Sequence, residues 1–249
     1  MKNLYKFLIF FFRVNWFKTI IFNIRYLKFS QACKFPVLIY GKSSFTGRGK
    51  IILPSKLYFG MIKLGLRFET ACVSPQGIHM KNEGCIIFDG SAKIGNAAGV
   101  VVGKNATLRL GKNFDTNGNI SIHCFSSVKV GRNFALGCDS VINDSDMHEH
   151  YDPTTNIKSP VSLPIVIGDN VWCCQRSMVL KGAIVPDWTT IGAMSVVTRK
   201  FELEPYSIIT GIPAKQINKK LKRIDTEYLE GKGPDWLLTS GLNTYTPQK

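Results

Sequence analysis

The hydrophobic positions between Ile167 and Val197 repeat every six residues. Inward-type side chains occupy Ile167, Cys173, Val179, Val185, Ile191 and Val197. Small or β-branched residues follow the first five of these at an offset of four: Val171, Ser177, Ala183, Thr189 and Ser195. A helix face repeats every 3.6 residues and a strand every 2, so neither element alone explains this period. It predicts a chain that turns a corner every six residues, with three sides in a coil of about eighteen residues and stacked coils forming a parallel β-helix.

The same repeat is present upstream but is less regular. It is clear at Phe88, Ile94 and Val100, and it then restarts three times with a shift of two residues. Gly and Asn cluster near the restarts, which indicates tight corners with positive φ. Residues 35–70 carry short β-rich runs that we interpret as imperfect opening coils. We therefore predict one all-β solenoid domain over residues 35–212.

Two segments depart from the repeat. The pattern stops after Ile142 and resumes at Ile167, which predicts an extruded loop over residues 143–164. Long loops on a rigid scaffold commonly carry function. The last coil is expected to end near Ile209. Residues 213–249 are predicted to form a basic amphipathic helix over Pro213–Tyr228 followed by a loose tail.

Residues 1–34 form a basic, aromatic and amphipathic segment. The net charge of the chain is +15, and residues 1–68 account for +13 of it, because the first acidic residue is Glu69. Lys and Arg interrupt the apolar run too often for a transmembrane helix, and no convincing signal-peptide cleavage site follows it. No nucleic-acid-binding motif is present. Two interpretations remain open: a helix lying in an anionic membrane interface, or a helix packed on the solenoid end or on a neighbouring subunit.

The extruded loop opens with the densest cluster of titratable residues in the chain. The run from Asn143 to His150 contains two histidines and three carboxylates, although the whole chain has only 4 histidines. A histidine can accept the proton of a hydroxyl as a general base. A metal site is the competing interpretation, but His148 and His150 alternate sides on an extended chain, so a site would need His123 or another subunit. We predict no metal. The 7 cysteines show no CxxC pair and are expected to be reduced, mostly packed thiols.

From Pro164 onward the chain resembles a known family. The segments PIVIGDNVW, VLKGAIVPDWTTIGAMSVVTRKF and YSIITGIPAKQI are similar to the C-terminal half of the hexapeptide-repeat acyltransferases. The run Asp144-Ser145-Asp146-Met147-His148 resembles the catalytic stretch of the branch that O-acetylates sugars and polysaccharides. The resemblance implies a left-handed parallel β-helix that forms a homotrimer. It also implies acetyl-CoA as the donor, bound between two subunits, and direct transfer without a covalent enzyme intermediate.

The resemblance also implies roles for individual residues. His148 is expected to be the general base, with Asp146 and Asp144 orienting its imidazole or binding sugar hydroxyls; Glu149 is the alternative orienting residue. The residues expected to contact acetyl-CoA are Trp172, Cys174, Gln175 and Ala193 along the pantetheine arm, and Thr198, Arg199 and Lys215 at the nucleotide end. The other interpretation is that these are ordinary coil residues and surface charges. Cys174 and Gln175 replace a glycine and a small residue of the family pattern, so they are expected to reshape the groove.

Taken together, the sequence predicts an acetyl-CoA-dependent O-acetyltransferase acting on a sugar hydroxyl in a cell-surface polysaccharide precursor. We expect it to be cytoplasmic and peripherally associated with the inner membrane. A soluble enzyme acting on small sugars fits the same residues, and transfer to an amine remains open. The alternative from a different class is a non-catalytic or metal-binding trimeric β-helix scaffold.

Overall fold

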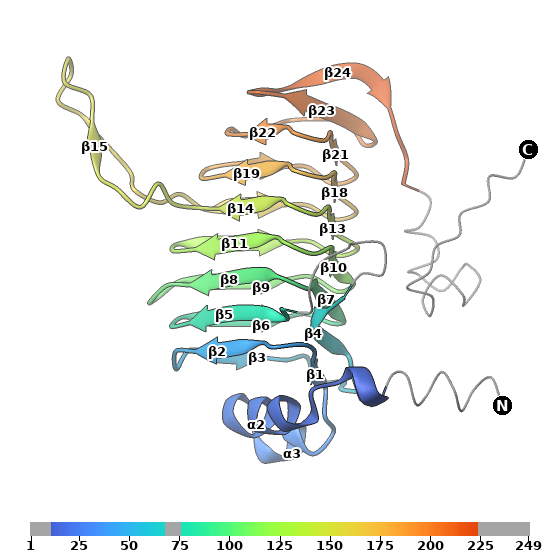
Figure 1. The fold of residues 1–249 in the computed structure, drawn as a ribbon. Helices are drawn as coiled ribbons and strands as arrows, with labels where there is room; N and C mark the ends of the chain where they lie inside the picture. Colours follow the sequence, from blue (N-terminus) through green and yellow to red (C-terminus); the bar gives the residue numbers. More distant parts are fainter. Residues whose placement is uncertain (1–10, 68–75, 224–249) are drawn as a thin grey trace, which may run out of the picture.

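The computed structural model describes residues 11–67 and 76–223 and shows a parallel β-helix (Figure 1). Three sheets form its sides, and the chain visits them in the same order in every coil. The first sheet contains β1 (Val37–Ile39), β4 (Ile62–Leu66), β7 (Ala92–Gly95), β10 (Phe114–Thr116), β13 (Ala135–Leu136), β18 (Trp172–Cys173), β21 (Thr190–Ile191), β23 (Ser207–Gly211) and β24 (Ala214–Lys220). The second contains β2 (Ser44–Thr46), β5 (Ile78–Asn82), β8 (Ala98–Val102), β11 (Ser121–Cys124), β14 (Val141–Asn143), β19 (Met178–Leu180) and β22 (Val196–Val197). The third contains β3 (Lys50–Ile52), β6 (Cys85–Phe88), β9 (Thr107–Leu110), β12 (Ser127–Val130), β17 (Ile165–Ile167) and β20 (Ile184–Val185).

The register between strands explains why the sequence repeat shifts. Near the C-terminal end Trp172 lies opposite Thr190. The separation of these two partners along the chain is the separation that a coil with three sides of six residues requires. Ile122 lies opposite Ile142, two positions further along the chain than that separation, and Val100 lies opposite Ile122, four positions further. The extra residues enter at the corners, so the strands stay aligned while the hydrophobic period appears to jump.

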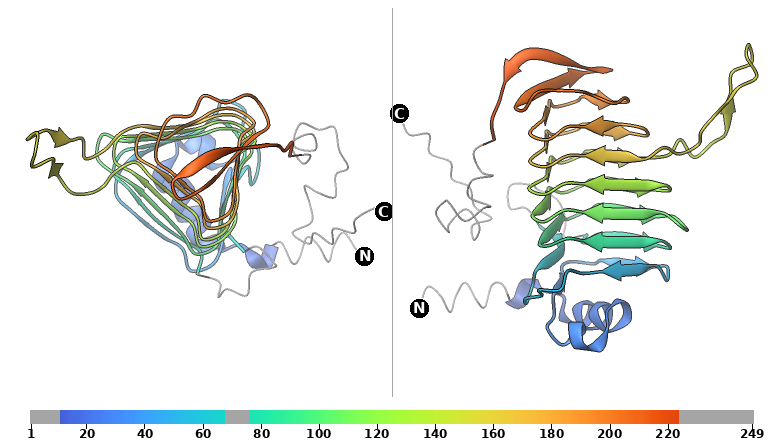
Figure 2. Two further views of the ribbon diagram at one scale, coloured as in Figure 1. Left: turned by 90° about the horizontal axis from the view of Figure 1, so that it is seen from above. Right: turned by 180° about the vertical axis from the view of Figure 1, so that it is seen from behind.

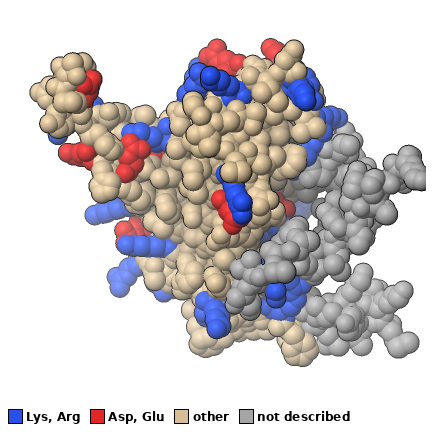
Figure 3. Space-filling view, turned by 45° about the horizontal axis from the view of Figure 1, so that its top comes forward, with Lys and Arg blue, Asp and Glu red and all other residues tan. Residues whose placement is uncertain are grey.

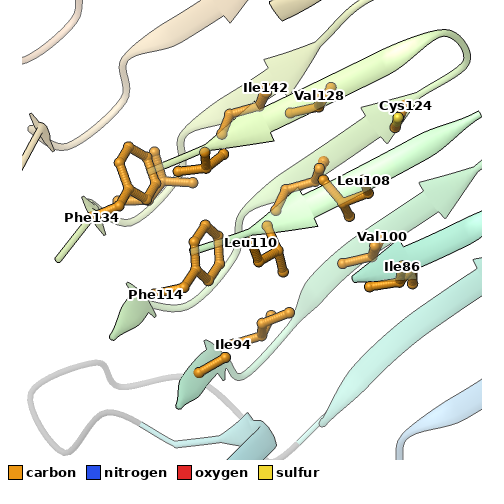
Figure 4. Packing of buried hydrophobic residues seen from close by; sticks show 14 of the residues in the cluster. Ile86, Ile94, Val100, Leu108, Leu110, Phe114, Cys124, Val128, Phe134 and Ile142 are labelled. Atoms are coloured by element: carbon orange, nitrogen blue, oxygen red, sulfur yellow. The ribbon is translucent and has the colours of Figure 1, made fainter. Parts of the chain in front are cut away.

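The inward positions of the coils form one continuous apolar core. The six residues that repeat every six positions from Ile167 to Val197 are all buried, and so are the small residues between them. In earlier coils larger side chains stack along the axis, and the rings of Phe114 and Phe134 lie 5.3 Å apart (Figure 4). The predicted inward face is therefore confirmed.

Asparagines stack at the corner between the third and first sheets. Asn113, Asn133 and Asn170 have φ values of 60°, 55° and 59°. The Asn113 amide donates to Asn133 Oδ1 at 2.9 Å, and the Asn133 amide donates to Asn170 Oδ1 at 2.9 Å. Asparagine tolerates this left-handed backbone better than most side chains do. The ladder thus fixes the corner conformation and links three coils.

The predicted C-terminal helix is wrong for residues 214–220. This segment forms β24, which turns back through Ile212 and Pro213 and pairs antiparallel with β23. The unpaired backbone groups at the edge of β23 gain partners in this way, and that gain outweighs the helix propensity of a Lys-rich segment. The remainder of the predicted helix and tail, residues 224–249, lies outside the described residues.

Two helices close the N-terminal end of the solenoid, α2 (Trp16–Tyr26) and α3 (Phe29–Ala32) (Figures 1 and 2). The inner face of α2 buries Thr19, Phe22 and Asn23. The Asn23 amide donates to Val37 O at 2.7 Å, and Thr19 Oγ1 accepts from Ile39 N at 3.0 Å, so the helix occupies the open edge of β1. Packing on the solenoid end, one of the two predicted alternatives, is confirmed for this face. None of the described helices is long and apolar enough to cross a membrane.

We predict that Asn133→Ala destabilises the β-helix more than Asn105→Ala does. Both residues have positive φ, at 55° and 65°. Asn105 is exposed and makes no hydrogen bond to the residues that the structure describes, whereas Asn133 makes two within the ladder. Each lost hydrogen bond costs about 0.5–1.5 kcal/mol, so the free energies of unfolding should differ by about 1–3 kcal/mol. Urea denaturation measures this difference, and equal losses would show that the ladder does not stabilise the fold.

Candidate active site

The predicted extruded loop is an ordered arm. It leaves the β-helix after β14 and returns at β17, at the corner between the second and third sheets (Figure 1). Within it β15 (His150–Tyr151) pairs antiparallel with β16 (Lys158–Ser159). Closer to the solenoid, Asp146 N donates to Val161 O at 2.9 Å. The arm is therefore a two-stranded projection whose base is tied by backbone hydrogen bonds.

Asp144 anchors the base of the arm. Its side chain is fully buried, and its two carboxylate oxygens accept from Phe125 N at 2.7 Å and Ser126 N at 2.8 Å. Its own N–H donates to His123 O at 3.2 Å in the coil beneath. Because both oxygens are engaged by the backbone, this geometry favours a structural role for Asp144 over contact with an imidazole or a sugar.

Asp146 lies between the side chains of Lys181 and His150. Its carboxylate forms an ion pair with Lys181 Nζ and lies 3.8 Å from His150 Nδ1. Lys181 Nζ also donates to Pro160 O at 2.8 Å, so one side chain from the next coil holds both strands of the arm. Lys181 was not predicted from the sequence. The feature that could have identified Lys181 is the register between β14 and β19. Leu180 stacks on Asn143, and Asn143 immediately precedes the arm, so Lys181 lies beside the base of the arm.

His148 is exposed on the arm, one residue after Met147, whose φ is 64°. It makes no hydrogen bond or ion pair to the described residues. The predicted orienting carboxylates lie elsewhere: Asp146 contacts His150, and Glu149 pairs with Lys158 at 3.6 Å. The structure therefore presents the His148 imidazole to solvent without bringing a carboxylate to it.

Four of the predicted donor-binding residues lie at, or directly before, the corner between the first and second sheets. Trp172 lies on the side formed by β18, and Cys174 and Gln175 follow at the corner. Ala193 lies on the coil above, where Met194 N donates to Gln175 O at 3.1 Å. These four residues form one vertical strip of surface, the Trp172 strip.

Hydrogen bonds to the backbone of Cys174 stabilise the corner, although the residue is not a glycine. Its carbonyl oxygen accepts from Ser177 Oγ at 2.8 Å and from Ser140 Oγ at 3.2 Å. Burial raises the pKa of the Cys174 thiol, so the group is protonated near neutrality and is a poor nucleophile. Cys174 thus occupies the position at which the resemblance predicts a glycine, and Gln175 is exposed on the strip.

The three residues predicted for the nucleotide end do not lie together. Thr198 and Arg199 follow β22 and share the corner of the arm. Arg199 is exposed, and its guanidinium carbon lies 4.9 Å from the centre of the Phe201 ring. Lys215 lies on β24 opposite Thr210, near the corner between the first and second sheets.

One chain does not bring His148 to the Trp172 strip. The two corners are separated by the whole second sheet, and a side of six residues spans up to about 20 Å. The view along the axis in Figure 2 shows the arm leaving from one corner and pointing away from the body. A site that uses both sets of residues must therefore draw them from two copies of the chain.

The described residues contain no group of three or more His, Cys, Asp and Glu side chains placed to hold a metal ion. Six of the cysteines lie in the described ranges, and all six are free thiols. Cys173 is fully buried at an inward position of the repeat and packs in the core.

We predict that Lys181→Met loosens the arm while the solenoid stays intact. The variant loses the ion pair to Asp146 and the bond to Pro160 O. Hydrogen exchange of residues 146–161 should become about tenfold faster, which corresponds to about 1.4 kcal/mol. The matched control is Lys158→Met, whose exposed pair with Glu149 contributes little. Unchanged exchange in Lys181→Met would show that the backbone alone holds the arm.

Comparison with known proteins adds the family context. No family model matches the chain. It is 27% identical over 114 residues to the galactoside O-acetyltransferase of Escherichia coli (strain K12), which covers 46% of this chain and 55% of that protein. The chain thus spans about half the length of that relative. It is 26% identical over 188 residues to the putative lipopolysaccharide biosynthesis O-acetyl transferase WbbJ of the same organism, covering 72% of this chain and 90% of that one.

Among solved structures, the polySia-specific acetyltransferase NeuO aligns with a TM-score of 0.56 and 18% identity, over 74% of this chain and 80% of NeuO. At this identity the likeness supports the fold. Both sequence relatives are named as acetyltransferases. The relatives and the structural neighbour named here are acetyltransferases, which agrees with the resemblance of the sequence to the hexapeptide-repeat acyltransferases.

Proposed function

We propose that this protein is an acetyl-CoA-dependent O-acetyltransferase whose acceptor is a hydroxyl of a saccharide. The observation that carries the proposal is His148, exposed on an ordered arm of a β-helix. The named relatives support the same reaction, because they include O-acetyltransferases of a galactoside and of lipopolysaccharide biosynthesis. Acetyl-CoA is the donor.

The proposed chemistry is a single transfer. The neutral imidazole of His148 takes the proton of the acceptor hydroxyl as its oxygen attacks the thioester carbonyl carbon. The tetrahedral intermediate carries its negative charge on the former carbonyl oxygen, which a backbone N–H stabilises. The carbon–sulfur bond then breaks, and the imidazolium returns the proton to the leaving thiolate. The acetyl group is thereby transferred to the sugar oxygen as an ester, and CoA is released as a thiol.

The active site would form between subunits of a homotrimer of left-handed β-helices. The separation of the arm corner from the Trp172 strip supports this assembly. His148 would come from one subunit, while Trp172 and Ala193 of its neighbour would line the pantetheine arm. Thr198, Arg199 and Lys215 carry hydroxyl and cationic groups suited to the phosphates of the nucleotide end. Their placement on two corners is consistent with a ligand that spans two subunits.

The acceptor we favour is a precursor of a cell-surface polysaccharide, acetylated on the cytoplasmic side of the membrane. The lipopolysaccharide-related name of one sequence relative supports this class. The competing hypothesis, a non-catalytic β-helix scaffold, predicts that the protein does not bind acetyl-CoA.

We predict that His148→Ala lowers the transfer rate by about 10²- to 10⁴-fold, because the general base is lost. Acetyl-CoA affinity, measured by calorimetric titration, should stay at its wild-type value. A galactoside and sialic acid oligomers serve as acceptor probes, and release of the CoA thiol reports turnover. The matched control is His150→Ala, which removes the neighbouring imidazole that contacts Asp146. A comparable loss in the control and none in His148→Ala would assign the base to His150, and failure of the wild-type protein to bind acetyl-CoA would favour the scaffold.

We also predict that Gln175→Ser tightens acetyl-CoA binding by about tenfold, equivalent to about 1.4 kcal/mol. The exposed Gln175 side chain stands where the family pattern has a small residue, so shortening it should open the groove. Gln31→Ser makes the same chemical change at the far end of the solenoid and should leave the dissociation constant unaltered. Weaker binding in Gln175→Ser would mean that this amide contacts the donor instead of obstructing it.

A further inference from the structure

Helix α2 has two apolar faces, and the solenoid covers only one of them. The inner face buries Phe22. On the outer face the exposed fractions are 73% for Phe17, 43% for Ile20, 46% for Ile21 and 66% for Ile24. Their spacing of three, four and seven residues places them on a single stripe. The side chains of this stripe are exposed within the described residues. Two phenylalanines outside α2 are exposed as well, Phe12 at 79% and Phe29 at 82%.

A cationic groove lies beside this stripe. Its volume is about 810 Å³, and its lining includes the four basic residues Arg25, Lys28, Arg48 and Lys50. The Arg25 guanidinium donates to Gly47 O at 3.1 Å and lies 5.2 Å from the centre of the Tyr26 ring, so the groove has one fixed positive group. None of the four forms an ion pair with a described acidic residue.

The N-terminal segment that the structure describes before residue 68 carries no acidic residue. Residues 11–67 contain eleven Lys and Arg and no Asp or Glu. In Figure 3 acidic residues lie on the arm, at the top and beside basic residues on the middle of the face, while the lowest part of the face displays Lys and Arg. The segment that carries the apolar stripe and the basic residues of the groove thus contains no acidic residue.

We propose that this N-terminal cap is a docking face for an anionic lipid membrane. Lipid phosphates would enter the groove, while Phe17, Ile24 and Phe29 would insert at the boundary between headgroups and acyl chains. Aromatic and aliphatic side chains beside Lys and Arg are the combination that binds helices to such interfaces. A second copy of the chain fits this face poorly, because a self-association would place one set of cations against another.

The docked orientation has a consequence for the proposed acetyltransferase, and this step rests on that proposed function. Docking on α2 stands the solenoid axis along the membrane normal. In the second sheet β14, from which the arm leaves, is four strands above β2. Four steps of about 4.8 Å and a helix about 10 Å across place the base of the arm about 30 Å above the lipid phosphates. The acceptor hydroxyl would then lie on an extended glycan, several sugars from its lipid attachment.

Vesicle flotation of the full chain tests the docking face. We expect the wild-type protein to float with vesicles of phosphatidylcholine containing phosphatidylglycerol and to stay unbound with phosphatidylcholine alone. Arg48→Gln with Lys50→Gln should weaken vesicle binding by about 10- to 30-fold, since each basic residue near the surface contributes about tenfold or less. Phe17→Ser with Ile24→Ser should weaken it by about tenfold or more.

Matched controls carry the same changes away from the cap. Ile157 on the arm is 66% exposed, and Lys104 and Lys129 are exposed on the coils. Ile157→Ser, and Lys104→Gln with Lys129→Gln, should bind vesicles as the wild-type protein does. The proposal is overturned if the wild-type protein fails to float with anionic vesicles or if the cap variants float equally well. It is also overturned if the cap variants change the oligomeric state in sedimentation without vesicles, which would make the cap a subunit interface.

Transfer to soluble acceptors, assayed without vesicles, separates this proposal from the proposed function. The cap variants should keep wild-type activity there, since their substitutions lie far from His148 and from the Trp172 strip. Loss of vesicle binding with intact transfer supports the docking face and the enzyme together. Normal vesicle binding by a protein that does not bind acetyl-CoA would uphold the docking face while removing the proposed function.

Discussion

The parallel backbone ladder between successive coils is the constraint on which the structure depends. Each strand must align with the strand above and the strand below, so every coil has to return to the same three directions. Only one or two residues per side then point inward, and their size must suit a narrow prism. This explains why buried Ile, Val and Leu alternate with Ala, Ser and Thr along the chain. It also explains why additional residues are accepted at corners and in the arm, where no ladder bond is broken.

The sequence predicted the structure correctly where backbone pairing between coils determines which side chains point inward. The hexad from Ile167 to Val197 predicted the inward face because each side chain there has one fixed role. The gap after Ile142 predicted the arm for the same reason. The sequence was less informative where tertiary pairing decides the outcome. Residues 214–220 have a helical composition, yet the free edge of β23 recruits them as a strand, and that edge exists only once the coils are stacked.

The candidate site shows the same division between local and long-range information. His148 was identified from its neighbours in sequence, and the structure places it in the open on the arm. Asp144 carries the same local signal, but its burial and its two backbone donors give it a different role. Lys181 has no local signal, because it reaches Asp146 from the following coil through the stacking of β19 on β14. The separation of the arm from the Trp172 strip follows from the order of the sheets and is invisible in any single motif.

The two ends of a solenoid pose one physical problem, because each leaves a row of unpaired backbone groups and an open hydrophobic core. The C-terminal end solves it with backbone, by folding β24 onto β23. The N-terminal end solves it with side chains, since Thr19 and Asn23 of α2 bond to the edge of β1 while Phe22 fills the core. Capping requires only one face of a helix. A surface selected for capping alone would carry polar residues on its outer face, as amphipathic helices of globular proteins do. The stripe from Phe17 to Ile24 is apolar instead, and residues 11–67 contain Lys and Arg but no Asp or Glu, so this composition fits a second surface that the cap contacts.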